Sequence, residues 1–231
     1  HENSTADARR RVFIITPGRT GSSLLGAILN DAGADFGVGS TGDWDPAGGA
    51  FEHPDLVPIV HDFERMNALG YRRPHRLWPR LLWTLARHRA KRGLKAILPQ
   101  AAYFKGELGP LVHWAARFGH PPTVIVSYRR FGDVLQSVGH LHPQPPSFHA
   151  SLYDGMLRDA LGLAAIYGGA VIDFEEIIDP SETAWAMALA EATGLDSQEL
   201  LDARAARIRP DATAREPAPE PFPSAAETYA L

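Results

Sequence analysis

The stretch that decides the fold is Val12-Phe-Ile-Ile-Thr-Pro-Gly-Arg-Thr-Gly-Ser-Ser-Leu-Leu25. Its first four residues are apolar and rich in β-branched side chains, which predicts a short buried strand. Pro17 and Gly18 end that strand, because both residues favour a turn. Residues 24–29 then place leucines and an isoleucine at the spacing of one helix face, and Gly33 is suited to stop the helix. We therefore expect a strand, a glycine-containing loop and a helix.

A loop in this setting is suited to an anion. The geometry aims several backbone N–H groups and the positive end of a helix at one spot, which fits a phosphate. The loop is dense in side-chain hydrogen-bond donors, namely Arg19, Thr20, Ser22 and Ser23. The alternative is an ordinary strand-to-helix turn. The density of donors favours anion binding.

The loop differs from that of nucleoside-triphosphate-binding proteins. Such a loop would read Gly, four residues, Gly, Lys and then Ser or Thr. With Gly21 as the second glycine, Thr16 stands where the first glycine belongs and Ser22 where the lysine belongs.

Residues 17–24 instead resemble the 5′-phosphosulfate loop of sulfotransferases that use 3′-phosphoadenosine 5′-phosphosulfate (PAPS). In that family a Lys or Arg precedes a Ser/Thr-Gly-Ser/Thr-Ser/Thr run. The resemblance implies cofactor contacts from Gly18, Arg19, Thr20, Gly21, Ser22 and Ser23.

A second phosphate motif begins where the strand predicted for residues 123–128 ends. Arg129 leaves that strand, Asp133 lies near the start of the next helix, and Ser137 lies about one turn into it. Because a strand end and the following helix start are adjacent, Arg129 and Ser137 can converge on one phosphate. Arginine suits this role, since its guanidinium can donate two parallel hydrogen bonds. In sulfotransferases an Arg and a Ser at this spacing, with Asp at the fourth step, bind the 3′-phosphate of PAPS.

Residues 44–56 supply the first candidates for the chemistry. They read Trp-Asp-Pro-Ala-Gly-Gly-Ala-Phe-Glu-His-Pro-Asp-Leu and resemble the segment after the first helix in many bacterial sulfotransferases. That resemblance implies that Glu52 and His53 face the acceptor. The alternative is that both residues cap or solvate the following helix.

Lys105 and Glu107 are the next candidates. In cytosolic sulfotransferases the catalytic His precedes the 3′-phosphate Arg, and a Lys lies two residues before that His. In this chain Glu107 precedes Arg129 by about the same number of residues, and Lys105 lies two residues before Glu107. Glu107 replaces that His, and a carboxylate can also act as a general base. Bacterial relatives tend to read Lys-Asp-Pro-Arg where this chain reads Lys-Gly-Glu-Leu. The lysine therefore carries over, whereas the identity of the base does not.

The resemblance implies transfer of a sulfuryl group to a hydroxyl or amine of a small-molecule acceptor, with release of 3′-phosphoadenosine 5′-phosphate (PAP). Positioning and charge stabilisation would dominate, and we expect no metal. The implied catalytic residues are Arg19, Glu52, His53, Lys105 and Glu107.

Two rival functions stay open. A P-loop kinase or other nucleotide phosphotransferase is disfavoured by the missing loop glycine and lysine. A non-catalytic nucleotide-binding module would keep the phosphate motifs and lack the base, and Gly106-Glu107-Leu108 favours that alternative.

Composition limits the other possibilities. The chain has 231 residues, a net charge of −4 and no cysteine, which excludes thiolate metal sites and cysteine nucleophiles. It has no apolar run of the roughly 18 residues needed to cross a bilayer, and we expect a cytoplasmic protein. Residues 65–106 contain no acid but 11 of the 23 Lys and Arg. Three interpretations of this segment are open: a solvated basic helix face, a positively charged surface that attracts an anionic ligand, or weak contact with a membrane surface. We expect no nucleic-acid partner.

The overall pattern predicts an α/β fold, with a mainly parallel sheet flanked by helices on both faces. We expect further strands at residues 97–105 and 169–174, a helix starting at Asp179 and ending at Gly194, and loop positions for His140, His142 and His149. The predicted organisation is a polar extension (1–10), one sulfotransferase-like domain (11–209) and a Pro/Ala-rich tail (210–231).

Overall fold

The computed structural model describes residues 10–37, 51–59, 77–106, 109–138 and 144–208. Within this part the chain forms one sheet of four parallel strands in the order β2-β1-β3-β4. The strands are β1 (Arg11–Ile15), β2 (Tyr103–Gly106), β3 (Pro122–Tyr128) and β4 (Gly169–Asp173). The predicted α/β class with a parallel sheet is confirmed.

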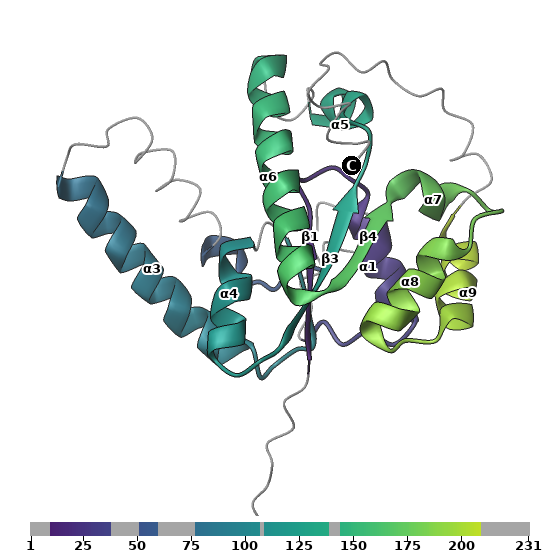
Figure 1. Ribbon diagram of the computed structural model, residues 1–231, viewed down its shortest axis with the longest axis horizontal. Coiled ribbons are helices and arrows are strands. Elements are labelled where there is room, and N and C mark those ends of the chain that lie inside the picture. Colours follow the sequence, from purple (N-terminus) through teal and green to yellow (C-terminus); the bar gives the residue numbers. More distant parts are fainter. Residues whose placement is uncertain (1–9, 38–50, 60–76, 107–108, 139–143, 209–231) are drawn as a thin grey trace, which may run out of the picture.

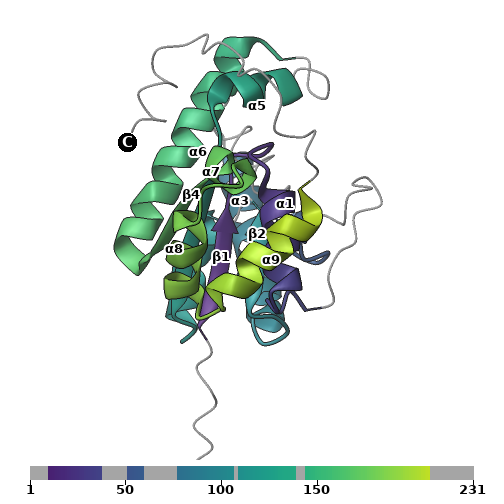
Figure 2. The same ribbon diagram turned by 90° about the vertical axis from the view of Figure 1, so that its right-hand side faces the viewer.

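Helices cover both faces of the sheet (Figures 1 and 2). One face carries α3 (Leu77–Ile97), α4 (Gly109–Arg117) and α6 (Pro146–Tyr167), and the other carries α1 (Ser22–Asp31), α8 (Ala184–Thr193) and α9 (Ser197–Arg207).

The sheet divides the hydrophobic core into two layers, and β1 contributes side chains to both. Because successive side chains of a strand point to opposite faces, Phe13 and Ile15 enter the layer that contains Leu94 of α3. Val12 and Ile14 enter the other layer. All five residues of β1 are buried, as expected for an inner strand of a parallel sheet.

Two short helices start at the carboxyl ends of the strands. Helix α5 (Phe131–Val138) follows β3, and α7 (Phe174–Ile178) follows β4 directly. The acidic residue predicted near the start of the helix after β3 is Asp133, which lies in the first turn of α5.

The prediction of a strand over residues 97–105 was partly wrong. Ala90, Leu94 and Ile97 continue one buried stripe at helical spacing, so α3 extends to Ile97 and β2 begins only at Tyr103.

The predicted helix start at Asp179 was also wrong. The Asp179 carboxylate accepts hydrogen bonds from the backbone N–H and the hydroxyl of Ser181, at 2.8 and 2.7 Å. These bonds fix a turn, and α8 begins at Ala184, five residues after the predicted cap, with Thr183 as its N-cap.

His149 is not a loop residue: it is buried in the first turns of α6, a helix that the sequence reading did not predict. His140 and His142 lie outside the described residues, as do residues 1–9 of the predicted extension and the whole predicted tail, residues 210–231. None of the described helices combines the length and apolar character needed to cross a membrane.

Candidate functional site

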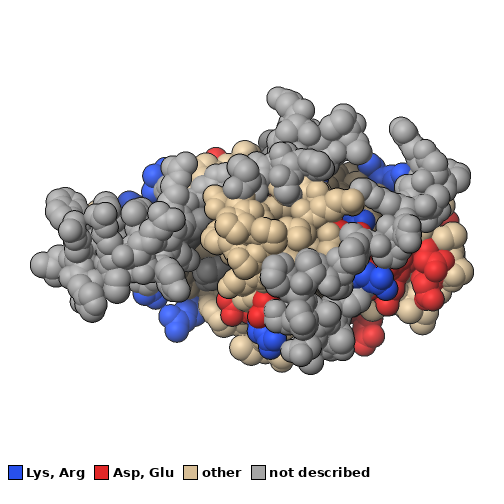
Figure 3. Space-filling model, turned by 90° about the horizontal axis from the view of Figure 1, so that it is seen from above, with Lys and Arg blue, Asp and Glu red and all other residues tan. Residues whose placement is uncertain are grey.

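The predicted site residues gather at the carboxyl ends of the strands, which is the edge where parallel α/β sheets bind ligands. The loop of residues 16–21 follows β1, Arg129 follows β3, and Lys105 lies near the end of β2. Figure 3 looks down on this side of the molecule, where Lys and Arg atoms lie beside Asp and Glu atoms.

The loop after β1 has an unusual backbone. Gly18, Arg19 and Gly21 all have left-handed conformations, with φ of 83°, 57° and 78°. Arginine rarely adopts such a φ, and residues held this way cluster at functional sites. Thr16 supports the turn: its hydroxyl accepts a hydrogen bond from the Gly18 N–H at 3.1 Å.

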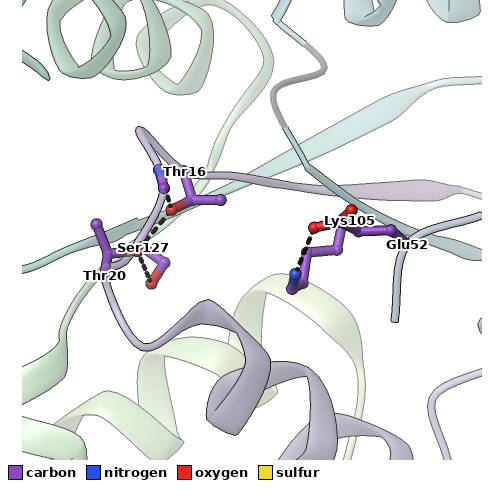
Figure 4. A network of polar contacts seen from close by, with 6 residues as sticks. Thr16, Thr20, Glu52, Lys105 and Ser127 are labelled. Carbon is purple, nitrogen blue, oxygen red and sulfur yellow. Dashed lines mark hydrogen bonds and ion pairs between the residues drawn. The ribbon is translucent and has the colours of Figure 1, made fainter. Parts of the chain in front are cut away.

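A chain of buried hydroxyls ties this loop to the sheet (Figure 4). The Thr20 hydroxyl lies 2.6 Å from that of Thr16 and 3.2 Å from that of Ser127, on β3. Thr20 and Ser127 are fully buried. The Thr20 side chain therefore braces the loop against β3. Ser22, also buried, begins α1, and Ser23 follows it.

The two predicted phosphate motifs meet through one hydrogen bond. Arg19 Nε donates to Ser137 Oγ at 2.9 Å, although 118 residues separate them along the chain. Arg19 belongs to the loop after β1, and Ser137 belongs to α5 after β3. Because β1 and β3 are neighbours in the sheet, the loop and the helix end up side by side.

Arg129 contacts several residues, yet its buried Nε atom makes no hydrogen bond within the described part of the chain. Its side chain is 20% exposed, and its Cζ lies 4.4 Å from the ring centre of Phe174. The Nε atom lies 3.6 Å from a Glu175 oxygen and 4.0 Å from an Asp133 oxygen, beyond hydrogen-bond distance. The Arg129 carbonyl accepts a hydrogen bond from the Tyr153 hydroxyl, which fixes the backbone here.

The Glu175 carboxyl beside Arg129 has a raised pKa. Desolvation raises the pKa of its carboxyl, the Arg129 charge opposes that rise, and Asp133 and Asp173 add to it. A buried N–H group without an acceptor is costly, and among the described residues the Arg129 Nε–H has none within hydrogen-bond distance. A bound anion could supply one.

Lys105 and Glu52 form the third part of the site (Figure 4). Lys105 Nζ lies 3.0 Å from Glu52 Oε1, and the two side chains are 2% and 31% exposed. Phe51, which precedes Glu52, has φ of 54° and packs against Phe36, with ring centres 5.3 Å apart.

His53 lies next to this pair and is buried. Its Nδ1 accepts a hydrogen bond from the Asp55 N–H at 3.3 Å, and its buried Nε2 has no partner in the described part. Desolvation lowers the pKa of His53, although the Asp55 charge opposes this, so the ring is neutral near pH 7.

Comparison with known proteins then tests the fold. No protein-family model and no curated protein sequence matches the chain. Among solved structures, the chain is similar to the sulfotransferase domain from the Synechococcus PCC 7002 olefin synthase. The TM-score is 0.54 at 17% sequence identity, and the match covers 96% of this chain and 94% of that one. The chain has a sulfotransferase fold.

The sulfotransferase fold brings most of the predicted residues to one edge of the sheet. Arg19 and Ser137 are in contact, Arg129 lies beside Asp133, and Lys105 pairs with Glu52. Glu107 lies outside the described residues. The described residues contain no cluster of three His, Asp or Glu side chains placed to hold a metal ion.

Part of the basic segment has a packing role in this sulfotransferase fold. Arg87 and Lys91 of α3 lie over the Trp114 ring of α4, at 5.9 and 5.3 Å from its centre. Arg92 and Lys95 are exposed on the same helix. A role of this helix in attracting an anionic ligand stays a prediction.

Sequence reasoning missed several residues that shape the site. Ser127 and Tyr153 brace it from β3 and α6, and Phe174 and Glu175 approach Arg129 from α7. The sequence held one usable signal, an aromatic residue followed by two acids directly after the strand that became β4.

Proposed function

We propose that this protein transfers a sulfuryl group from PAPS to a hydroxyl or amine of a small-molecule acceptor and releases PAP. The observation that carries the proposal is the environment of the Arg129 side chain. This side chain is 20% exposed at the carboxyl ends of the strands, and its buried Nε donates no hydrogen bond to the described residues. A nucleotide phosphate is an anion that would pair with it through two parallel hydrogen bonds. Ser137, at the predicted spacing, would complete this 3′-phosphate site.

The loop after β1 would hold the 5′-phosphosulfate. Its backbone N–H groups and the start of α1 supply fixed dipoles, and Ser22 and Ser23 stand at the first turn of that helix. Arg19 would offset the negative charge that grows on the departing 5′-phosphate. Its hydrogen bond to Ser137 ties this loop to the proposed 3′-phosphate site.

The transfer itself would be an in-line displacement at sulfur. A bond forms between the acceptor oxygen or nitrogen and sulfur, and the bond from sulfur to the bridging oxygen of the 5′-phosphate breaks. Lys105 would stabilise the charge on the sulfuryl group or the bridging oxygen. The acceptor proton would pass to a base, for which Glu52 is the best-placed described residue because its carboxylate is partly exposed and already paired with Lys105.

His53 and Glu107 are the other candidates for the base. His53 is neutral but buried, so the acceptor would need access to its Nε2. Glu107 remains a proposal from the sequence resemblance. The setting in the cytoplasm and the absence of a metal also remain proposals.

The proposal is tested by incubating the protein with PAPS and a panel of phenols, alcohols and amines, and measuring PAP release. We expect release with at least one acceptor and its loss in Lys105→Met. Arg117→Ala is the matched control and should retain activity. It changes an exposed residue at the end of α4, near the end of the sheet where the strands begin. PAP binding without transfer across the panel would favour a non-catalytic nucleotide-binding module. Phosphoryl transfer from ATP with magnesium would favour the kinase.

A further inference from the structure

Phe174 is an aromatic residue whose place in the fold is not explained by core packing. It is the first residue of α7, directly after β4, and is half-buried. Among the described residues it belongs to neither of the two hydrophobic layers. Its neighbours are instead parts of the proposed nucleotide site.

The first neighbour is Arg129. The Arg129 Cζ lies 4.4 Å from the centre of the Phe174 ring, within range of a cation–π interaction. A guanidinium plane resting on an aromatic ring loses much of its rotational freedom. The ring therefore restricts the direction in which Arg129 presents its N–H groups.

The second neighbour is Gly21 of the loop after β1. A Cβ atom at Gly21 would lie 2.0 Å from Phe174 Cδ2 and 2.3 Å from Cε2, which no real side chain tolerates. The ring thus occupies the space that a side chain at residue 21 would need. Phe174 touches the loop proposed to bind the 5′-phosphosulfate and the arginine proposed to bind the 3′-phosphate.

The backbone at Phe174 is itself fixed. The Asp173 carboxylate accepts a hydrogen bond from the Glu175 N–H at 3.0 Å and caps α7. Asp173 is paired with Tyr128 in the register of β4 and β3, one residue before Arg129. The Glu175 carboxylate, 3.6 Å from Arg129 Nε, restrains the arginine from a second direction.

We propose that Phe174 is a positioning residue that fixes Arg129 relative to the loop after β1, and thereby sets the preference for nucleotides that carry a 3′-phosphate. This inference rests on the proposed function. It assigns a role to a residue outside both phosphate motifs: the ring holds two binding elements, from β1 and β3, at a set separation.

The test is calorimetric titration of the full chain with PAP and with adenosine 5′-monophosphate (AMP), which lacks the 3′-phosphate. The ratio of the two affinities measures what the 3′-phosphate contributes. Phe174→Leu keeps an apolar side chain without a ring face, and we expect it to lower this ratio about three- to thirtyfold, the range of a cation–π contact. In an Arg129→Ala background the same substitution should change the ratio less than twofold.

Phe118→Leu is the matched control, because Phe118 packs on the hydrophobic layer that contains Leu94 and follows α4, near the opposite edge of the sheet. It should leave the ratio unchanged. Phe174→Met serves if the leucine variant does not fold, as judged by its thermal unfolding, and should lower the ratio in the same way.

Two results would overturn the inference. Equal losses of PAP and AMP affinity that persist in the Arg129→Ala background would mean that the ring acts on the base or on general stability. An unchanged ratio in a folded Phe174→Leu protein would mean that the ring does not orient Arg129; both results leave the proposed function standing. Failure of the folded wild-type protein to bind PAP would remove the proposed function and this inference together.

Discussion

The pair formed by Lys105 and Glu52 predicts an asymmetry between two substitutions. Lys105 is almost fully buried, whereas nearly a third of the Glu52 side chain is exposed. Replacing Glu52 by Gln leaves a buried ammonium group without its counter-charge. Replacing Lys105 by Met removes the buried charge and leaves a carboxylate that can turn toward water. The first substitution should therefore cost much more stability than the second.

The magnitudes follow from the geometry. At the observed 3.0 Å, two unit charges attract by about 5.5 kcal/mol when the effective dielectric constant is about 20, before the cost of removing them from water. Breaking a fully buried pair costs roughly 3–5 kcal/mol, and the partial exposure of Glu52 lowers this to about 2–3 kcal/mol for Glu52→Gln. We expect Lys105→Met to cost less than about 1 kcal/mol, because an apolar side chain of similar length replaces a buried ion.

The measurement is urea unfolding followed by the fluorescence of the five tryptophans. Asp154→Asn is the control, because Asp154 pairs with the exposed Arg158 on α6 at 3.1 Å and should lose at most about 1 kcal/mol. The double variant should match Lys105→Met. The reasoning is refuted if Lys105→Met destabilises the protein as much as Glu52→Gln.

Three further predictions concern the loop and two titrating groups. Gly21→Ala should weaken PAP binding and should be less stable than Gly33→Ala by about 1 kcal/mol or more, the range of overpacking. Both glycines have a positive φ, but only a Cβ at Gly21 would meet the Phe174 ring. Equal stability of the two variants in urea unfolding would contradict this. Burial, and to a lesser extent the negative charge of the nearby Asp173, raises the pKa of Tyr128 to about 12, above its unfolded value of 10.0. Stability should therefore fall between pH 10 and 12, and Tyr128→Phe should reduce that fall in alkaline unfolding curves. Desolvation lowers the pKa of His53 below 6.5, so stability should fall as the pH drops below that value; His53→Asn should flatten the acid limb, and an unchanged limb would count against a buried neutral ring.

The sequence was sufficient where the signal was local. Residues 12–15 formed the predicted strand and residues 22–31 the predicted helix, because a β-branched run, a Pro-Gly turn and a helical apolar spacing act over a few residues. The position of Asp133 at a helix start was predicted for the same reason. Helix α6 was missed because Gly155 and Gly162 weaken its helical pattern, so packing against β3 and β4 must stabilise it.

The contacts between motifs could not be predicted from the sequence. The bond from Arg19 to Ser137 exists because β1 lies beside β3, and the approach of Phe174 to Arg129 exists because β4 lies beside β3. Strand order is a property of the whole sheet, and no short pattern encodes it. The same reason explains why Lys105 was predicted as a site residue but its pairing with Glu52 was not.

The central claim is that Arg129 binds the 3′-phosphate of a PAPS-type nucleotide, and calorimetric titration with PAP tests it most directly. Wild type, Arg129→Ala and the control Arg117→Ala are titrated with PAP, and with ATP plus magnesium as comparator. We predict that wild type and Arg117→Ala bind PAP and prefer it to ATP, and that Arg129→Ala binds PAP at least tenfold more weakly, a loss of about 1.4 kcal/mol or more. Absence of PAP binding by the folded wild-type protein, or equal affinity in Arg129→Ala, would contradict the claim.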